Sequence, residues 1–342
     1  MSGPRSAEGG SLAPPPARLL VYRPGAIGDL VLALPALEAL RAAHPQAHLT
    51  VAGHPGAVVL ARAAGLADTV LDADSAVLTP LFAPTPPIPA PLPVPDVAVL
   101  WAGPAAQPLA ASLRALGTRE VLRVPAQPAA ECRQHVADYL ARSLEAIGVA
   151  ARLPAVPRLP LDRALVADVA AFLATEGGPG GAWLAVHAGS GSPRKNWASA
   201  QFAAVARVLA ARGLRPLLVA GPAEAELVEG MLDGLAPLRP PVAREWPLPR
   251  LAALLSLCAG YVGADSGITH LAAAVGIPVV AVFGPTDPAR WAPRGPRVVV
   301  VRRPVACQPC TWEAMWACPH RACLTALGPT AVVTAVTRAL GL

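Results

Sequence analysis

Residues 257–288 constrain the fold of this chain more than any other stretch. A short apolar strand from Leu257 to Val262 runs into a turn at residues 265–267, and an Ala- and Leu-rich helix follows from Ile268 to Val275. A glycine ends that helix, a proline follows it, and Val279 to Phe283 is a second buried strand. A strand–helix–strand crossover makes its two strands parallel, so the sequence predicts an α/β fold with a parallel sheet.

The turns that leave these two strands carry polar residues. Asp265, Ser266 and Gly267 form the first turn, His270 lies one helical turn later, and residues 284–288 read Gly-Pro-Thr-Asp-Pro. Open parallel sheets bind ligands at the carboxyl ends of their strands, and the free N–H groups of a helix start favour an anion or a hydroxyl-rich ligand. Alone, each residue could be a helix cap or a buried core histidine; together they favour a binding site.

A second turn of this kind lies near the start of the chain. The strand Arg18 to Tyr22 runs into Arg-Pro-Gly-Ala-Ile-Gly-Asp, with Gly25, Gly28 and Asp29, and then into a helix. Glycines let the backbone approach a ligand closely, but the dinucleotide spacing G-x-G-x-x-G is absent. By itself, Asp29 is equally explained as a first-turn acid that interacts with the helix dipole.

A third turn follows the predicted strand Trp183 to His187 and precedes a helix from Ala200 to Arg212. Its small and hydroxylated residues allow close backbone approach, and its basic residues supply positive charge where a diphosphate would sit. The Walker pattern is absent. The phosphate-binding candidates are Ser190, Gly191, Ser192, Arg194 and Lys195.

Taken together, these segments resemble the signature of glycosyltransferase family 9, the ADP-heptose:lipopolysaccharide heptosyltransferases. The resemblance covers about residues 18–342 and rests above all on Asp265-Ser266-Gly267, on His270-Leu271-Ala272-Ala273-Ala274 and on the run 282–288. It implies an α/β protein of the GT-B type, in which two Rossmann-like domains face each other across a cleft. It also implies inverting transfer of a heptose or related sugar from an ADP-sugar to lipopolysaccharide core or a related glycan.

The resemblance assigns roles to the motif residues. Asp29 would be the general base, with Gly25 and Gly28 on the acceptor side. The donor phosphates would lie on Ser190, Gly191, Ser192 and Lys195, and the donor sugar on Asp265, Ser266, Gly267 and His270. A carboxylate near residue 225 would bind the ribose, and Glu224 and Glu226 are both candidates. No Asp-x-Asp pair stands near the phosphate loop, so catalysis is expected to need no metal or other cofactor.

The domain organisation follows from the same pattern. We expect a disordered tail at residues 1–17, an acceptor domain at 18–178 and a donor domain at 179–328, with the boundary near the glycines of 177–181. The C-terminal helix, residues 329–342, would pack back on the first domain. The Pro-rich stretch 75–95 is predicted to be a surface loop, either covering the acceptor site or inert.

Four of the six cysteines cluster near the C-terminus, within seventeen residues of one another. They are Cys307, Cys310, Cys318 and Cys323. The first pair has the C-x-x-C spacing of metal sites, whereas the second spacing departs from a zinc ribbon. Structural zinc, an iron–sulfur cluster, free thiols and redox-dependent disulfides all stay open at this point.

Composition narrows the remaining alternatives. A chain of 342 residues accommodates two domains, and its net charge of +6 comes from scattered arginines rather than from a basic block, which argues against a nucleic-acid partner. Neither a signal peptide nor a membrane span is visible, so we expect a cytoplasmic protein, in contact with the inner face of the membrane at most. The expected partners are a nucleotide-sugar donor and a glycolipid or glycan acceptor. The rivals are a same-fold transferase for another nucleotide sugar and a non-catalytic nucleotide-binding homologue.

Overall fold

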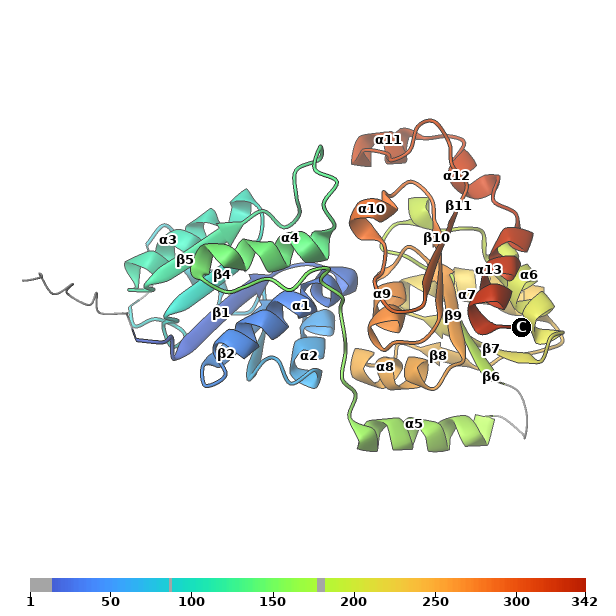
Figure 1. Ribbon diagram of the computed structural model, residues 1–342, viewed down its shortest axis with the longest axis horizontal. Coiled ribbons are helices and arrows are strands. Elements are labelled where there is room, and N and C mark those ends of the chain that lie inside the picture. Colours follow the sequence, from blue (N-terminus) through green and yellow to red (C-terminus); the bar gives the residue numbers. More distant parts are fainter. Residues whose placement is uncertain (1–13, 86–87, 177–181) are drawn as a thin grey trace, which may run out of the picture.

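Two parallel sheets, one in each half of the chain, organise the computed structural model, which describes residues 14–85, 88–176 and 182–342 (Figure 1). All the strand pairs are parallel, as the crossover pattern predicts. The predicted disordered tail lies largely outside the described residues, as does the predicted boundary at 177–181.

The first domain has five strands in the order β3-β2-β1-β4-β5. They are β1 (Arg18–Arg23), β2 (His48–Gly53), β3 (Thr69–Asp72), β4 (Val97–Trp101) and β5 (Glu120–Val124). The α-helices are α1 (Ile27–Ala43), α2 (Pro55–Ala63), α3 (Gln107–Ala115) and α4 (Val136–Ser143). Three short 3₁₀ turns complete the domain: η1 (Thr79–Phe82), η2 (Pro104–Ala106) and η3 (Leu144–Ile147).

The second domain has six strands in the order β11-β10-β9-β6-β7-β8. They are β6 (Ala182–His187), β7 (Leu214–Ala220), β8 (Val242–Arg244), β9 (Gly260–Ala264), β10 (Val279–Phe283) and β11 (Val298–Arg302). The longer helices are α5 (Arg163–Glu176), α6 (Ser199–Ala210), α7 (Ala225–Leu235), α8 (Leu248–Ser256), α9 (Gly267–Ala274) and α13 (Pro329–Leu340). Shorter ones are η4 (Pro193–Lys195), η5 (Pro222–Glu224), α10 (Pro288–Trp291), α11 (Trp312–Ala317) and α12 (Ala322–Thr325).

Helices cover both faces of each sheet. Because successive side chains of a strand point to opposite sides, both sets of side chains are buried under these helices. In β1, Leu19 and Val21 pack toward α1, α2 and α4, whereas Leu20 and Tyr22 pack toward α3 and η1. The second sheet is covered by α8 and α9 on one face and by α6, α7 and α13 on the other. Both halves are therefore Rossmann-like, and the predicted GT-B arrangement is confirmed.

The two domains meet where α1 and α9 begin. A Cβ atom on Gly267 would lie 2.6 Å from Ile27 Cβ and 2.8 Å from Gly28 N, so the backbones of the two helix starts are in direct contact. Behind this contact, the buried residues of α1 and α9 belong to one apolar cluster that runs through both domains. The contact brings the two ligand-binding turns predicted from the sequence to one place.

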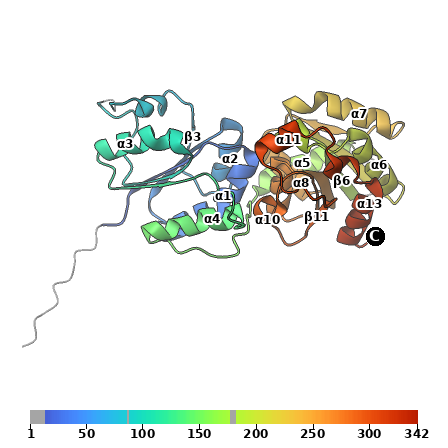
Figure 2. The ribbon, with the colours of Figure 1, turned by 90° about the horizontal axis from the view of Figure 1, so that it is seen from above.

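Two details of the predicted domain organisation are wrong. Helix α5 packs against α8, so this part of the predicted acceptor domain belongs with the second sheet (Figures 1 and 2). The C-terminal helix α13 packs against α6 and the strands β9, β10 and β11 instead of the first domain. Its buried valines Val332, Val333 and Val336 fill the outer core of the second sheet, which needs an apolar cover on that face.

The Pro-rich stretch is only partly a surface loop. Leu78 and Leu81, in and beside η1, are fully buried in the core between the first sheet and α3. The described residues of 75–95 therefore close one face of the first domain, and none of them lines the cavity between the domains. Throughout the described ranges, the helices are too short or too polar to span a bilayer.

The contact between α1 and α9 predicts that Gly267→Ala destabilises the protein. The added methyl overlaps Ile27 and the Gly28 backbone, and overpacking of this kind costs about 1–3 kcal/mol. Urea unfolding measures the change. Gly103→Ala is the matched control, because a Cβ on Gly103 meets nothing within 4 Å and its φ is −73°. Equal stability of the two variants would contradict the inferred contact.

Candidate active site

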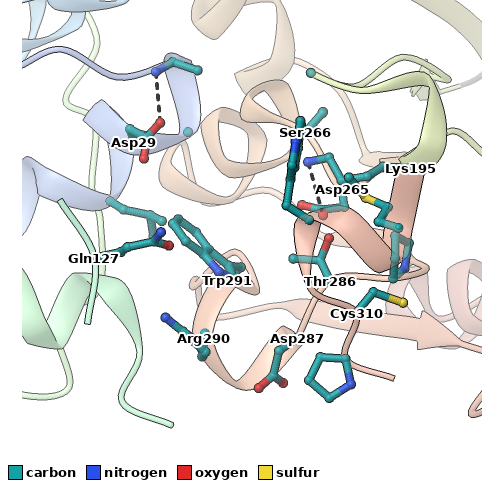
Figure 3. A pocket seen from close by; sticks show the side chains of 18 of the residues that line it. Asp29, Gln127, Lys195, Asp265, Ser266, Thr286, Asp287, Arg290, Trp291 and Cys310 are labelled. Carbon is teal, nitrogen blue, oxygen red and sulfur yellow. Dashed lines mark hydrogen bonds and ion pairs between the residues drawn. The ribbon is translucent and has the colours of Figure 1, made fainter. Parts of the chain in front are cut away.

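A cavity of about 740 Å³ lies between the two domains (Figure 3). Asp29 enters it from α1, and Lys195, Asp265 and Ser266 enter it from the opposite side. The first domain lines it with Ala26, Gly28, Asp29, Leu32, Gln127, Pro128 and Ala130. The second domain lines it with Gly191, Lys195, Asp265, Ser266, Gly267, His270, Pro285, Thr286, Asp287, Arg290, Trp291, Pro309, Cys310, Thr311, Trp312, Glu313 and Met315.

Asp29 has a fixed carboxylate at the start of α1. Its Oδ1 accepts from Arg23 Nη2 at 2.8 Å, and its Oδ2 accepts from the Ala26 N–H at 2.9 Å. The side chain is 29% exposed, so it remains accessible to a molecule in the cavity. Asp29 therefore caps its helix, as the simpler interpretation holds, while it faces the cavity as the catalytic one requires.

Lys195 and Asp265 form an ion pair on the opposite wall. Lys195 Nζ lies 3.3 Å from Asp265 Oδ2, and the lysine side chain is 22% exposed whereas the carboxylate is nearly buried. Although the two charges are close, Asp265 Oδ2 accepts no well-directed hydrogen bond. The ammonium group is thus held at the cavity by charge and keeps donors free for an anionic ligand.

His270 is buried beside this ion pair, and its Nδ1 has no hydrogen-bond partner. Burial lowers the pKa of His270 to about 4, against a smaller opposite effect of Asp265. The imidazole is therefore neutral near pH 7 and offers one donor and one acceptor nitrogen. A buried polar atom without a partner at a cavity wall is suited to a hydroxylated ligand.

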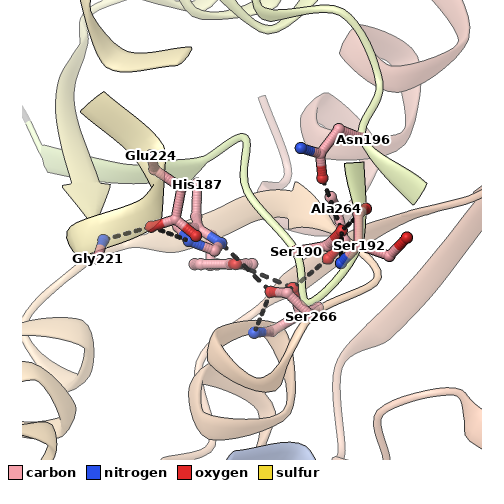
Figure 4. A network of polar contacts seen from close by, with 10 residues as sticks. His187, Ser190, Ser192, Asn196, Gly221, Glu224, Ala264 and Ser266 are labelled. Atoms are coloured by element: carbon pink, nitrogen blue, oxygen red, sulfur yellow. Dashed lines mark hydrogen bonds and ion pairs between the residues drawn. The ribbon is translucent and has the colours of Figure 1, made fainter. Parts of the chain in front are cut away.

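The predicted phosphate loop is only partly directed at the cavity. Gly191 and Lys195 line it, whereas Ser190 Oγ donates within the loop to Asn196 Oδ1 and the Ser192 carbonyl, both at 2.6 Å (Figure 4). Ser192 is buried and accepts from the Arg194 N–H. The two serines thus shape the loop in this structure, although a contact between them and phosphate stays a prediction.

The two ribose candidates, Glu224 and Glu226, differ in their surroundings. Glu224 lies at the carboxyl end of β7, 3.6 Å from His187 Nε2, and accepts from the Gly221 N–H (Figure 4). Burial alone would raise its pKa, but His187 and the Gly221 N–H outweigh this effect and leave the pKa below its ordinary value. Glu226 is exposed on α7, and neither glutamate lines the cavity wall.

A hydroxyl network joins Glu224 to the helix start at α9. His187 Nδ1 lies 3.2 Å from Ser266 Oγ, which also contacts Thr269 Oγ1 at 3.1 Å. Thr269 in turn contacts the buried hydroxyl of Tyr261 at 2.9 Å. Ser266 is therefore both the N-cap of α9 and a member of a polar chain that runs behind the second-domain wall of the cavity.

The four clustered cysteines come together in a small hollow of about 20 Å³. It is lined by Arg194, Pro285, Cys307, Cys310, Met315, Cys318, Arg321, Ala322 and Cys323. All four thiols are free, and among the described residues no group of three or more His, Cys, Asp or Glu side chains is arranged to hold a metal ion. The arrangement as it stands thus gives no support to a preformed metal site.

Several cavity residues escape prediction from the sequence. Gln127 and Trp291 face each other across the domains (Figure 3), and Arg290 donates to the carbonyls of Pro128 and Ala130. Gln127 follows β5 outside any motif, and Arg290 and Trp291 lie on the short helix α10, just beyond the Gly-Pro-Thr-Asp-Pro run. His135 is a buried N-cap at the start of α4, and its Nε2 contacts the Ala292 carbonyl of the second domain at 2.9 Å.

Comparisons with known proteins fit this geometry. Residues 121–315 match the model of glycosyltransferase family 9 (heptosyltransferase). Lipopolysaccharide heptosyltransferase 3 of Escherichia coli is 38% identical over 104 residues, which are 29% of this chain and 30% of the relative. The alignment thus spans less than a third of that curated relative.

Solved structures resemble the chain over nearly its whole length. The glycosyl transferase family 9 structure from Veillonella parvula DSM 2008 has a TM-score of 0.77 at 19% identity and covers 95% of this chain and 97% of that one. The E. coli heptosyltransferase WaaC with ADP has a TM-score of 0.66 at 19% identity and covers 94% and 99%. At these identities the likeness concerns the fold.

The burial of His270 predicts a pH-dependent stability that a substitution removes. Between pH 6.5 and 4 the unfolded chain binds a proton at this histidine and the native chain does not, so the stabilisation present above pH 6.5 is lost as the pH falls to about 4. The loss is about 3 kcal/mol. Urea unfolding measures the free energy of unfolding at both pH values. Between pH 6.5 and 4 it should decrease by about 3 kcal/mol less in His270→Gln than in the wild type.

The exposed His54 offers the matched control. His54→Gln should follow the wild type across the same pH range. Parallel curves for the wild type and His270→Gln would contradict the neutral, buried state of His270.

Proposed function

The chain belongs to glycosyltransferase family 9, and we propose that it transfers a heptose or a related sugar from an ADP-activated donor to lipopolysaccharide core or a related glycan. One observation carries the proposal. The Asp29 carboxylate of the first domain lies on the same cavity as Lys195 and Asp265 of the second. A carboxylate base and a cationic diphosphate site on opposite walls suit a transfer between two bound substrates.

The second domain would bind the donor. Lys195 and the N–H groups at the start of α9 would stabilise the diphosphate, and more strongly as charge develops on the leaving group. Glu224 is the better placed ribose ligand, since its carboxylate stands at a strand end whereas Glu226 points to solvent. The similarity in fold to a heptosyltransferase solved with ADP supports an ADP-sugar donor.

The sugar would lie between the domains, against Asp265, Ser266, Gly267 and His270. The neutral His270 and the buried Asp265 offer a hydrogen-bond donor and acceptors to sugar hydroxyls. Gly267, which has no side chain, leaves the N–H groups of the helix start accessible. These contacts would orient the anomeric carbon toward Asp29.

The first domain would present the acceptor, with Gly25 and Gly28 near its hydroxyl. Asp29 would take the proton of the acceptor hydroxyl. The oxygen of that hydroxyl would form a bond to the anomeric carbon as the bond between this carbon and the diphosphate breaks. Attack from the face opposite the diphosphate inverts the anomeric centre. The products are the extended glycan and ADP, and the scheme uses the side chains of this chain alone.

The acceptor class implies a location. Because lipopolysaccharide core is carried on a lipid, we propose that the protein works in the cytoplasm and contacts the inner face of the membrane peripherally. Its net charge of +6 favours contact with acidic headgroups.

We also propose that the four clustered cysteines hold one structural metal ion after a small rearrangement. A divalent ion with four thiolates carries a net charge of −2, and Arg194 and Arg321 line the same hollow. The N–H groups of Arg321 and His320 lower the pKa of Cys318 and favour its thiolate, whereas burial raises the pKa of Cys310 and of Cys323, so that a bound cation would have to favour their thiolates. Protein purified without oxygen should contain about one zinc or iron per chain, measured by elemental analysis. Absence of stoichiometric metal would overturn this proposal and leave the transferase proposal intact.

The catalytic prediction is that Asp29→Asn lowers the rate of sugar transfer about 10²–10⁴-fold without loss of ADP binding. The amide keeps the size of the side chain but cannot accept the proton, and general bases contribute about 10²–10⁴-fold in rate. Transfer is measured from an ADP-heptose to a heptose-deficient lipopolysaccharide, and ADP affinity by calorimetry.

Lys195→Met supplies the complementary control. It should weaken ADP binding about 10- to 150-fold, since a charge-assisted hydrogen bond contributes about 1.5–3 kcal/mol. Retained transfer in Asp29→Asn would exclude the base assignment. If the wild type binds ADP but transfers and hydrolyses none of a set of ADP-, GDP- and UDP-sugars, the chain is a non-catalytic homologue.

A further inference from the structure

We propose that Arg23 is a positioning residue for the transfer reaction and that its guanidinium group holds the Asp29 carboxylate in the orientation needed to accept a proton. The inference rests on the proposed function. It concerns a residue that no motif singled out as functional and that lies beneath the cavity rather than in its wall.

Arg23 is a buried cation at the end of β1. It is only 2% exposed, and its Nη2 donates to Asp29 Oδ1 at 2.8 Å. Its Nη1 is 3.4 Å from the Trp101 carbonyl on the neighbouring strand β4, and its Nε has no partner. Among the ion pairs of the described ranges, Arg23 takes part in this one only. The buried charge therefore depends on Asp29 for its compensation.

Two further restraints act on the same carboxylate. The Ala26 N–H donates to Oδ2 at 2.9 Å. The side chain of Asp29 also fills the space beside Gly25, where a Cβ atom would lie 2.5 Å from Asp29 Cβ and 2.8 Å from Oδ2. Each carboxylate oxygen keeps lone pairs for a substrate hydroxyl, while the group as a whole has little freedom to rotate.

Burial determines the role of Arg23. A side chain 2% exposed cannot touch a ligand in the cavity, so its effect on the reaction must pass through Asp29. Leaving one member of a buried ion pair without its partner is strongly unfavourable, so the Arg23 charge favours conformers that keep Asp29 in place. His270 of α9 lies close enough to Asp29 for the two groups to interact electrostatically, and it is neutral near pH 7.

The experiment compares Arg23→Met, which removes the charge, with Arg23→Lys, which keeps it. If Arg23 positions the base, Arg23→Met lowers kcat about 100-fold, the loss typical of a displaced catalytic group, while KM for the ADP-heptose and the affinity for ADP stay unchanged. Arg23→Lys should recover at least about tenfold of this loss. Should Arg23→Met not fold, Arg23→Gln supplies the neutral variant.

Arg41→Met is the matched control. Arg41 forms an ion pair with Asp68 at 2.6 Å in the same domain, and neither residue lines the cavity. This variant should change stability without changing kcat. If Arg23→Met and Arg23→Lys lose activity equally, or if Arg41→Met loses as much, Arg23 is merely structural and the inference is wrong.

A double-mutant cycle separates this inference from the proposed function. Adding Arg23→Met to Asp29→Asn should cause no further loss of residual activity, because Arg23 acts through Asp29. A further loss would assign Arg23 another role. If Asp29→Asn is inactive while Arg23→Met alone keeps full activity, only the inference about Arg23 fails. If Asp29→Asn is active, the base assignment itself fails.

Discussion

The contact between the starts of α1 and α9 is the constraint on which the site depends. Gly267 lies directly against Ile27 and the backbone of Gly28, so two helices from different domains begin at one point. Each helix start carries unpaired N–H groups and a partial positive charge, and each follows a strand at the carboxyl edge of its sheet. One glycine contact thus merges two separate ligand-binding edges into a single cavity. A side chain at Gly267 would overlap Ile27 and the Gly28 backbone and disturb the spacing of the walls that Asp29 and Lys195 occupy.

Polar contacts on the other side of the interface complete this geometry. Arg294 binds both oxygens of Asp138 at 2.6 and 2.8 Å, and His135 contacts the Ala292 carbonyl. Burial alone would raise the pKa of Asp138, but the hydrogen bonds from Arg294 and Ala155 lower it further. The pKa is therefore below its ordinary value, and the carboxylate stays ionised in the pair. Arg290 joins α10 to the carbonyls of Pro128 and Ala130. The cavity is therefore bounded by apolar packing at the helix starts and by directional contacts at the opposite rim, which together fix the distance between its walls.

The sequence predicts the elements of this site better than their surroundings. The crossover at 257–288 has a strict apolar pattern, and its prediction as strand, helix and parallel strand is confirmed because local pattern and tertiary burial agree there. The placement of α5 and α13 is not decided locally, since each helix buries only two or three apolar residues, which could cover either sheet. Ser190 and Glu224 show the same limit at the level of side chains: the residue type suggests a ligand, whereas the hydrogen bonds depend on the fold. Arg23 was quoted within a motif, yet only the structure shows that it is buried against Asp29.

The charged groups in and near the cavity occur in pairs, and the pairs differ in which member is exposed. Each of three carboxylates has a basic side chain beside it. The pairs are Asp29 with Arg23, Asp265 with Lys195, and Glu224 with His187. In two of the pairs, the cationic or titratable partner is buried more deeply than the carboxylate: Arg23 compared with Asp29, and His187 compared with Glu224. The third pair is reversed, because Asp265 is buried and Lys195 is partly exposed. Under the proposed function, the Asp29 base must keep its negative charge accessible to the acceptor, and a diphosphate site at Lys195 must keep its positive charge accessible to the donor. The reversal would then give each wall the sign of charge that its proposed substrate requires, with both groups oriented before either substrate is bound.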